Sequence, residues 1–297
     1  MEKHKRVLTI VEGREANQKM MREVIEVGAE RGWGVRLLKH ISSIDIANNR
    51  LDGLFTEYVW WRGFGTNSGY ESARVMEYVN RLKGVRTINT HIVGGLAGTS
   101  NKYYQHGVMA YEKDLAEHIL PMYETQSKMR ALQLVEKGAI NYPFVVKPVF
   151  GTQGEGITLI RKEKDLDKVK DFTQTGIESY VQSKYDWRVF VLGGKALGVM
   201  RKTGGDDETD FELKSAGKTK RNEDDPEIYA EVTRLAELAA KTSGLDYTGV
   251  DLIRDDKTGI FYVVETNFAA GWQNGFKKAT GVDVPLEVFK YFESFDK

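Results

Sequence analysis

A glycine-rich segment, VFGTQGEG at Val149–Gly156, lies between two apolar runs that favour β-strands, FVVKP before it and GITLI after it. Glycines let backbone N–H groups approach an anion closely, because they carry no side chain. The spacing here is G-x-x-G-x-G, whereas the Walker and dinucleotide-binding patterns have other spacings and lead into a helix. The segment is therefore either a phosphate-binding loop without a helix dipole or a plain turn between two strands.

The N-terminal part of the chain alternates β-rich runs with helical patterns. RVLTIV at residues 6–11 favours a strand, residues 15–30 follow a helical pattern with one apolar side, and GVRLLKH favours a second strand. This succession predicts a parallel sheet, because the helix supplies the crossover between parallel strands. We expect an α/β domain of residues 1–98, which also contains the strands GLFTEYVWW and VRTIN with a helix between them.

The rest of the chain mixes helices and strands without an internal repeat, so the fold class is α/β with α+β character. Helices are predicted within residues 101–114 and 124–138 and near 164–172, and strands at HILPMY, FVVKP, GITLIRK and IESYVQ. Two further strands meet at the turn Gly193–Gly194, and another two meet at DDKTG. The polar segment Thr203–Asp225 is predicted to be a mobile loop, followed by a helix near Pro226 and a last helix at the end of the chain.

Composition excludes several classes of function. Lysine plus arginine equals aspartate plus glutamate at 43 each, so no net charge favours nucleic acid or an anionic membrane. The absence of cysteine excludes disulfides, thiolate nucleophiles and thiolate-bound metals. No segment has the ~20 apolar residues of a membrane span, and the first apolar run is shorter than that of a signal peptide. We expect a cytoplasmic protein.

Lys147 lies inside the apolar run FVVKP, four residues before the first glycine of the loop. A lysine in such a run either extends its amine to solvent or pairs with an anion. Taken alone, the first reading is the simpler one. Its closeness to the glycine segment favours the second, with phosphate as the anion.

Asp251, Glu265 and Asn267 lie in the strands TGVDLIR and FYVVETN. If DDKTG closes a hairpin, the two strands are antiparallel neighbours and the three side chains converge, since Glu265 and Asn267 already share a face. Two carboxylates and an amide oxygen suit Mg²⁺ together with water and phosphate oxygens. The alternative is a solvated polar face, which the apolar surroundings make less favourable.

Other charged residues allow two readings. Asp186 and Arg188 share one face of the strand DWRVFV, where they could also form an ordinary ion pair. Arg201 and Lys202 end the strand ALGVMRK, and charged strand ends are commonly solvated. Arg62 follows VWW, and its aromatic neighbours weaken that simpler reading.

Taken in order, FVVKPVFGTQGEGITLI, IESYV, DWRVFVLGGKALGVMRK, TGVDLIR and FYVVETN…GFKKATGVDVP resemble the ATP-grasp superfamily, and within it the RimK-like carboxylate–amine ligases. GTQGEG and KATGVDV are the most specific parts of the resemblance. It implies an ATP-grasp fold behind a pre-ATP-grasp domain, with one subdomain at residues 99–180 that carries the glycine loop and another at 181–297 that carries the metal site.

The resemblance also implies roles in binding ATP and Mg²⁺. Lys102 and Lys147 would bind the phosphates, with Asp186 on the ribose. Asp251, Glu265 and Asn267 would hold two Mg²⁺ ions, with Mn²⁺ as an alternative metal. The phosphate loop would consist of Gly151, Thr152, Gln153, Gly154, Glu155 and Gly156, and the strand beside adenine of Glu178, Ser179, Tyr180 and Val181.

Further residues would serve catalysis and the substrates. The resemblance places Arg201 near the transferred phosphoryl group, where Lys147 would share the catalytic role. Where related ligases carry Arg-Ser-Asn and His-Arg-Gly-Gly runs, this chain has DFELKSAGKTK, so Lys214, Lys218 and Lys220 are alternative sources of positive charge. Substrate contacts are expected at Arg62, Arg188, Lys202 and Lys214.

These features predict an ATP- and Mg²⁺-dependent ligase that activates a carboxylate as an acyl phosphate and joins it to an amine. The partners would be a small-molecule or peptide carboxylate and an amino-acid amine such as glutamate, without nucleic acid or membrane. Related ligases are often homo-oligomers. A phosphotransferase on the same scaffold and a non-catalytic nucleotide-binding module are the alternatives. A water-sensitive acyl phosphate needs a closing lid, a role that suits the glycine loop.

Overall fold

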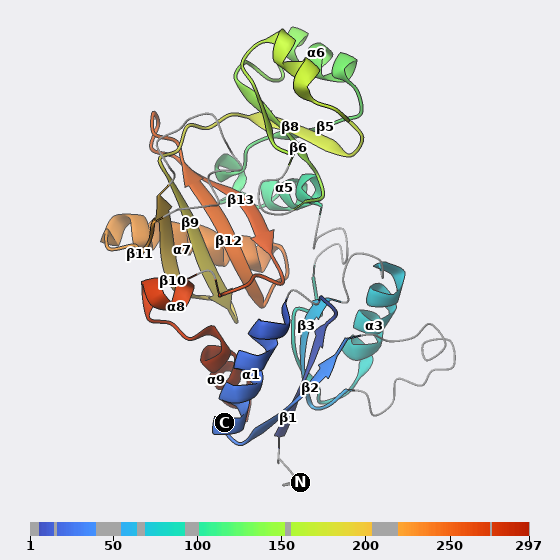
Figure 1. The fold of residues 1–297 in the computed structure, drawn as a ribbon, viewed down its shortest axis with the longest axis vertical. Coiled ribbons are helices and arrows are strands. Elements are labelled where there is room, and N and C mark those ends of the chain that lie inside the picture. Colours follow the sequence, from blue (N-terminus) through green and yellow to red (C-terminus); the bar gives the residue numbers. More distant parts are fainter. Residues whose placement is uncertain are drawn as a thin grey trace.

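The structure is a computed structural model that describes residues 6–14, 17–39, 55–63, 69–92, 101–151, 156–203, 219–273 and 275–296. It contains three sheets that follow one another along the long axis of the molecule (Figure 1). The first sheet lies nearest both chain ends, the β9–β13 sheet lies in the middle, and the β5–β8 sheet, which contains the strands on both sides of the glycine segment, lies at the far end. No helix in these ranges combines the length and apolar character needed to cross a bilayer.

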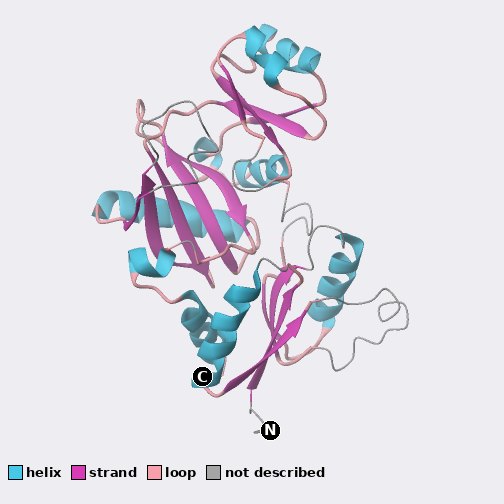
Figure 2. Ribbon diagram, in the orientation of Figure 1, coloured by secondary structure: helices cyan, strands magenta, loops and turns pink. Residues whose placement is uncertain are grey.

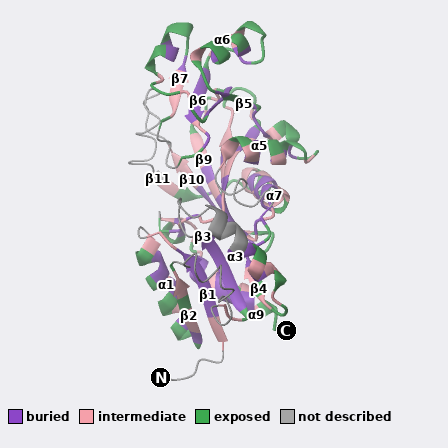
Figure 3. Cartoon of the chain, turned by 90° about the vertical axis from the view of Figure 1, so that its right-hand side faces the viewer, coloured by how far each residue is buried: buried purple, intermediate pink, exposed green. Residues whose placement is uncertain are grey.

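The first sheet is parallel, as the strand, helix, strand pattern predicts, with the order β2-β1-β3-β4. One face packs against α1 (Gln18–Glu30) and α9 (Val284–Ser294), and the other against α3 (Gly69–Arg81). Its central strands β1 and β3 are largely buried, while α1 and α9 also carry exposed surface (Figure 3). Its strands are β1 (Arg6–Glu12), β2 (Trp33–Leu38), β3 (Tyr58–Gly63) and β4 (Arg86–Ile88).

The middle sheet is antiparallel with the order β11-β10-β9-β12-β13 (Figure 2). One face packs against α7 (Pro226–Thr242), which begins at an Asp225 N-cap with proline in its first turn. Part of the other face packs against α8 (Phe276–Thr280) and α9. Its strands are β9 (Tyr185–Leu192), β10 (Lys195–Thr203), β11 (Thr219–Asn222), β12 (Tyr247–Arg254) and β13 (Phe261–Asn267).

The third sheet is antiparallel with the order β5-β8-β6-β7. Because β6 and β7 are adjacent antiparallel strands, the glycine segment joins two paired strands, as predicted. One face packs against α6 (Lys128–Glu136). Helix α5 (Lys102–Ala110) contacts both β5 and β13, so it lies between this sheet and the middle one. The strands are β5 (Met122–Thr125), β6 (Phe144–Pro148), β7 (Thr158–Ile160) and β8 (Thr175–Ser179).

Three local predictions need correction. The polar segment Thr203–Asp225 contains strand β11, which pairs with the end of β10. Its residues have no apolar pattern, so the sequence does not predict a strand there. The expected helix near residues 164–172 is a short 3-10 helix, η3 (Glu163–Lys168), and a second one, η2 (Ala116–His118), precedes β5. The expected last helix is divided into α8 and α9 at Gly281, whose φ of 77° ends α8.

Candidate active site

One face of the middle sheet is apolar at one end and charged at the other. Along β9, Phe190 and Leu192 join the buried cluster that includes residues of α8 and α9. Arg188 and Asp186 continue the same face, because alternate residues of a strand point the same way. The pairing register brings Asp251, Lys202 and Lys220 onto this face as well, opposite Arg188, Asp186 and Lys202 respectively.

Asp251 is the centre of this charged region. Arg188 donates through Nε to Asp251 Oδ1 at 2.6 Å and through Nη2 to Oδ2, and Lys202 Nζ lies 3.5 Å from Oδ1. Burial alone would raise the pKa of Asp251, but the charges of Arg188 and Lys202 lower it overall. The carboxylate is therefore ionised and held by two cations of the same face.

Glu265 and Asn267 extend the cluster on β13, as the hairpin predicts. Glu265 lies directly opposite Asp251 in the register, and Asn267 Nδ2 donates to Asp251 Oδ2 at 3.1 Å. Burial raises the pKa of Glu265, with Asp251 adding to the rise and Lys102 opposing it. The three predicted metal ligands thus lie together on adjacent strands.

Lys102 connects this cluster to the glycine segment. Its Nζ lies 3.3 Å from Glu265 Oε1 and donates to the carbonyl oxygen of Gly151 at 2.6 Å. Its backbone N–H donates to Val149 O at 2.9 Å. One ammonium group at the start of α5 therefore touches both the first residue of the loop and a predicted metal ligand.

Lys147 is buried on β6 and pairs with Glu178 of β8, whose Oε1 lies 2.6 Å from Nζ. Of the two readings for a lysine in an apolar run, pairing with an anion is the one observed, although the anion is a carboxylate of the chain. His106 of α5 lies next to this pair, with Nδ1 3.9 Å from Glu178 Oε2. Ser179 is exposed, and Tyr180 and Val181 are half-buried.

The ends of the glycine loop are described, while Thr152, Gln153, Gly154 and Glu155 lie outside the described residues. Gly156 has a φ of 75°, and a Cβ there would lie 2.9 Å from Pro148 Cγ. A glycine is therefore required at this end of the loop on both conformational and steric grounds.

Arg201 lies on the opposite face from the cluster. It is directly opposite Trp187 in the register, and its Nη1 donates to Glu223 Oε1 at 3.3 Å. Glu223 in turn accepts from Trp187 Nε1 at 2.6 Å. Because neighbouring residues of a strand point to opposite faces, Lys202 joins Asp251 and Arg201 does not.

Of the remaining expected substrate residues, Arg62 is described and is separated from this face. Arg62 is fully buried at the end of β3, where it pairs with Glu12 and not with Asp251. Lys214 and Lys218 lie outside the described residues, whereas Lys220 is described and lies opposite Lys202. Arg188 and Lys202 are thus the expected substrate residues that contact a predicted metal ligand.

The oxygen atoms of Asp251, Glu265 and Asn267 can be compared with the ligands that Mg²⁺ prefers. No group of three or more histidine, cysteine, aspartate or glutamate side chains forms a metal cluster within the described ranges. Asp251 and Glu265 offer two carboxylates and Asn267 an amide oxygen, which suits Mg²⁺ when phosphate and water oxygens complete its shell. The residues present therefore fit a nucleotide-bound magnesium better than a cation held by protein alone.

Comparisons with known proteins decide the family. The model of the RimK-like ATP-grasp domain matches residues 99–292, which is more than half of the chain. The chain belongs to the RimK-like ATP-grasp family. Two probable alpha-L-glutamate ligases are among its relatives. The one from Haemophilus influenzae (strain PittEE) is 32% identical over 164 residues, covering 52% of each chain, and the one from Cellvibrio japonicus is 27% identical over 302 residues, covering 92% of this chain and 90% of the relative.

The chain therefore spans about half the length of the first curated relatives it matches. Solved structures show the same ATP-grasp fold. The ATP-grasp ligase PsnB, complexed with minimal precursor, Mg and ADP, has a TM-score of 0.69 at 15% identity, over 98% of this chain and 97% of that one. A D-alanine–D-alanine ligase from Bacillus anthracis has a TM-score of 0.64 at 18% identity, over 91% and 89%. ATP-grasp ligases use ATP and Mg²⁺.

Several contacts near the candidate site could not be predicted from the sequence of this RimK-like chain. His106 and Gln105 of α5 bond to backbone atoms of Val264 and Thr266 on β13, and so fix the helix that carries Lys102. Glu223 holds Arg201 on the far face. Their partners are distant in sequence, so no local pattern marks them. Glu12 could have been noticed, since it is a carboxylate directly after the apolar run of β1.

Gly249 should resist substitution because two neighbours occupy the space of a side chain. A Cβ there would lie 2.7 Å from Ala270 Cβ and 3.1 Å from Arg188 Cδ. Gly249→Ala is expected to lower the free energy of unfolding by about 1–3 kcal/mol, as overpacking does. Urea unfolding measures the change. Gly107→Ala is the matched control, because a Cβ on that α5 residue meets nothing within 4 Å and should be neutral or stabilising; equal losses in both variants would contradict the argument.

Proposed function

We propose that this protein is an ATP- and Mg²⁺-dependent carboxylate–amine ligase that forms an amide bond through an acyl phosphate. The contact of Lys102 with both Gly151 O and Glu265 Oε1 carries the proposal, because it joins a glycine loop to a pair of carboxylates. A nucleotide whose phosphates lay beside Lys102 would also be within reach of the groups suited to Mg²⁺. The names of the curated relatives favour glutamate as the amine substrate.

Nucleotide binding would use the third sheet and its loop. Lys102 and Lys147 would bind the phosphates, under the loop Gly151–Gly156 as a lid that excludes water. Lys147 pairs with Glu178 at 2.6 Å, so contact with a phosphate would take place beside this carboxylate. Adenine would lie along residues 178–181, and Asp186 would accept from the ribose hydroxyls.

Magnesium would be held by Asp251, Glu265 and Asn267, where it would neutralise charge on the phosphoryl oxygens. Arg188 and Lys202 bond to Asp251 in the structure, so a cation there would replace part of this pairing. The released guanidinium and ammonium groups lie on the same face and would bind the carboxylate substrate or the transferred phosphoryl group. We assign that role to Lys202 and Arg188 in preference to Arg201, which Glu223 holds on the other face.

The chemistry requires no covalent enzyme nucleophile. A carboxylate oxygen would attack the γ-phosphorus and release ADP, which gives an acyl phosphate. The amine would then attack the acyl carbon, form the C–N bond, expel phosphate and lose a proton. Because the C–O bond of the acyl phosphate breaks, one oxygen of the original carboxylate ends on inorganic phosphate.

That oxygen transfer gives the experiment that tests the proposal. The protein is incubated with ATP, Mg²⁺, glutamate and a panel of heavy-oxygen-labelled carboxylic acids and peptides, and ADP, phosphate and products are followed by mass spectrometry. A glutamyl amide and labelled inorganic phosphate are expected. A stable phosphomonoester formed without amine would instead support a phosphotransferase. Nucleotide binding without ADP release for any pair would support a binding module, and both outcomes contradict the ligase proposal.

A further inference from the structure

The segment that follows Asn267 is held by side chains outside β13. Three consecutive backbone carbonyl groups after the end of the strand each accept a hydrogen bond. The donors are Asn89 Nδ2 to Phe268 O at 2.8 Å, Arg62 Nη2 to Ala269 O at 3.0 Å, and Tyr247 OH to Ala270 O at 2.8 Å. Two of these donors belong to the first sheet or the residues directly after it, so the first sheet restrains the end of a strand in the middle sheet.

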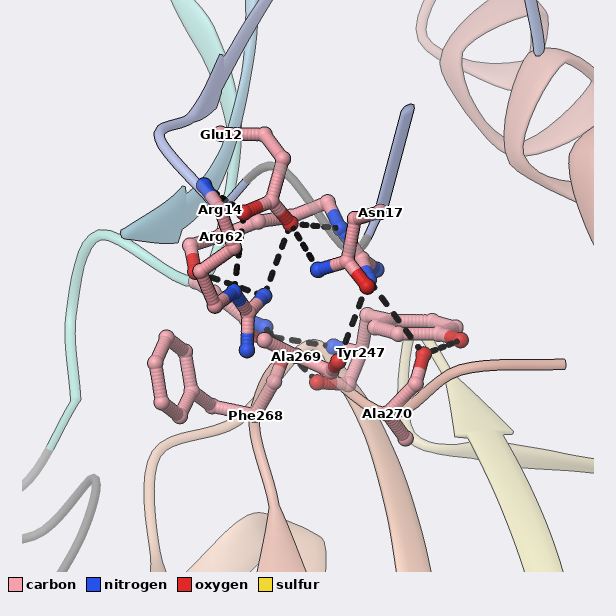
Figure 4. Close-up of polar contacts among 9 residues, drawn as sticks. Glu12, Arg14, Asn17, Arg62, Tyr247, Phe268, Ala269 and Ala270 are labelled. Atoms are coloured by element: carbon pink, nitrogen blue, oxygen red, sulfur yellow. Dashed lines mark hydrogen bonds and ion pairs between the residues drawn. The ribbon is translucent and has the colours of Figure 1, made fainter. Parts of the chain in front are cut away.

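Arg62 lies between Glu12 and the segment that follows Asn267 (Figure 4). Its side chain is 0% exposed, and Nε donates to Glu12 Oε2 at 3.1 Å. The guanidinium carbon lies 4.9 Å from the ring centroid of Trp60 and 5.2 Å from that of Trp272. Aromatic rings at these distances attract a cation and restrict its rotation. The group that holds Ala269 O therefore has almost no freedom to move.

Glu12 in turn accepts hydrogen bonds from three residues. Arg14 donates through Nε and Nη2 to its two carboxylate oxygens at 2.8 and 2.7 Å, and Asn17 Nδ2 donates to Oε2 at 2.8 Å, in addition to the bond from Arg62. Among the residues that the structure describes, none is a hydrogen-bond partner of Arg62 Nη1. A buried, unpaired N–H group costs stability, so stability alone does not account for an arginine at this position.

Asn89 provides the second restraint from the first sheet. It lies just after β4 with a φ of 63°, a left-handed conformation that asparagine adopts more readily than most residues. Besides Phe268 O, its Nδ2 donates to Tyr247 O at 2.7 Å, and Tyr247 N donates to its Oδ1 at 2.9 Å. The start of β12 and the end of β13 are thereby held at a fixed spacing.

We propose that Arg62 and Asn89 are positioning residues that set the place of Asn267, and so of the proposed magnesium site, from the first sheet. This rests on the proposed function, because Asn267 matters as a metal ligand. Arg62 acts through Ala269 O and Ala270 O, since a fully buried guanidinium is not open to a substrate. The first sheet thereby governs metal affinity.

The test separates metal binding from nucleotide binding. Binding of Mn²⁺ is measured by electron paramagnetic resonance with saturating ADP, and ADP binding is measured separately in EDTA. Arg62→Met keeps the length of the side chain but loses its donors. It is expected to raise the Kd of Mn²⁺ about 10-fold, as loss of a group that orients a metal ligand does, and to leave the Kd of ADP in EDTA within about twofold.

Two further variants make the result decisive. Arg31→Met is the control variant. It breaks the ion pair between Arg31 and Glu293 of α9, whose atoms lie 2.5 Å apart and which does not involve the segment after Asn267. The Kd of Mn²⁺ and the Kd of ADP should both stay unchanged. Asn89→Gly tolerates the left-handed backbone but loses the amide that bonds Phe268 O, and serves if Arg62→Met does not fold; a weaker rise in the Kd of Mn²⁺ is expected.

The outcomes distinguish this inference from the proposed function. Wild-type protein that binds neither ADP nor Mn²⁺ with ADP overturns both. Wild-type protein that binds them, with unchanged Mn²⁺ affinity in Arg62→Met, or in Asn89→Gly where the first variant does not fold, overturns the inference alone. Equal losses of Mn²⁺ and metal-free ADP binding in the variant would also overturn it, because they indicate general damage to the fold.

Discussion

Replacing Glu265 by glutamine is expected to lower Mg²⁺-dependent ADP release by about 1000-fold while leaving the protein folded. Glu265 lies directly opposite Asp251 and contacts Lys102 at 3.3 Å, so it belongs to the proposed metal site. Burial raises its pKa, because desolvation disfavours the charged form of the carboxyl. Removing that charge should therefore change the free energy of unfolding little, whereas it should strongly weaken binding of Mg²⁺ at the proposed site.

Asp251→Asn should lower Mg²⁺-dependent ADP release by a similar factor, and it should also lower the stability of the fold. Its carboxylate neutralises Arg188 and Lys202, and its loss leaves two cations side by side on a partly buried face. We expect the free energy of unfolding to fall by about 1–3 kcal/mol, the usual cost of removing one partner of a charged hydrogen bond. ADP release and urea unfolding measured on the same preparations separate the two effects.

Glu231→Gln on α7 is the control for both variants, because α7 covers the opposite face of the middle sheet. It should keep wild-type turnover. Wild-type ADP release in Glu265→Gln or Asp251→Asn would contradict the assignment of these residues as metal ligands.

The largest loss of stability is expected from Glu12→Gln. Glu12 pairs with both Arg62 and Arg14, and its side chain is almost completely buried. Breaking a buried ion pair by neutralising one partner costs about 3–5 kcal/mol, because the other charge stays buried without compensation. Urea unfolding near neutral pH measures this. Glu77→Gln, which breaks an exposed pair with Arg81, should cost less than about 1 kcal/mol.

The same pair makes stability depend on pH. Burial would raise the pKa of Glu12, but the hydrogen bonds of Arg14 and the charge of Arg62 lower it overall from 4.5. A carboxyl whose pKa is lower in the folded state contributes stability above the unfolded value and loses it as the pH falls through the folded value. The stability difference between wild type and Glu12→Gln should therefore be constant above about pH 4.5 and shrink below it. A difference that stays constant in acid would show that the charge of Glu12 is not what stabilises the fold.

Much of the fold follows from local patterns. β1, α1 and β2 could be predicted because their apolar residues recur with the periods of a strand and a helix, and a helix between two strands implies parallel pairing. β12 and β13 could be predicted as a hairpin from the turn DDKTG. Strand β11 could not, because its four polar residues form a strand only by pairing with β10.

The candidate site was predictable to the extent that its residues share a strand or a hairpin. The alternation within TGVDLIR and FYVVETN is enough to bring Asp251, Glu265 and Asn267 together. The same alternation separates Arg201 from Lys202, but the sequence does not indicate which of the two faces the cluster. That choice depends on the register of β10 against β9, since the buried Trp187 fixes which face packs on α7.

Local patterns were enough to predict a glycine loop between two strands, lysines beside it, and candidate oxygen ligands on a hairpin, because each lies within a short stretch whose periodicity sets its geometry. Which charges meet depends on how the sheets pack. Lys102 contacts both the loop and Glu265, Arg188 pairs with Asp251, and Arg62 pairs with the buried Glu12. These contacts connect separate sheets, and their partners lie far apart in the chain, so packing and not local pattern selects them.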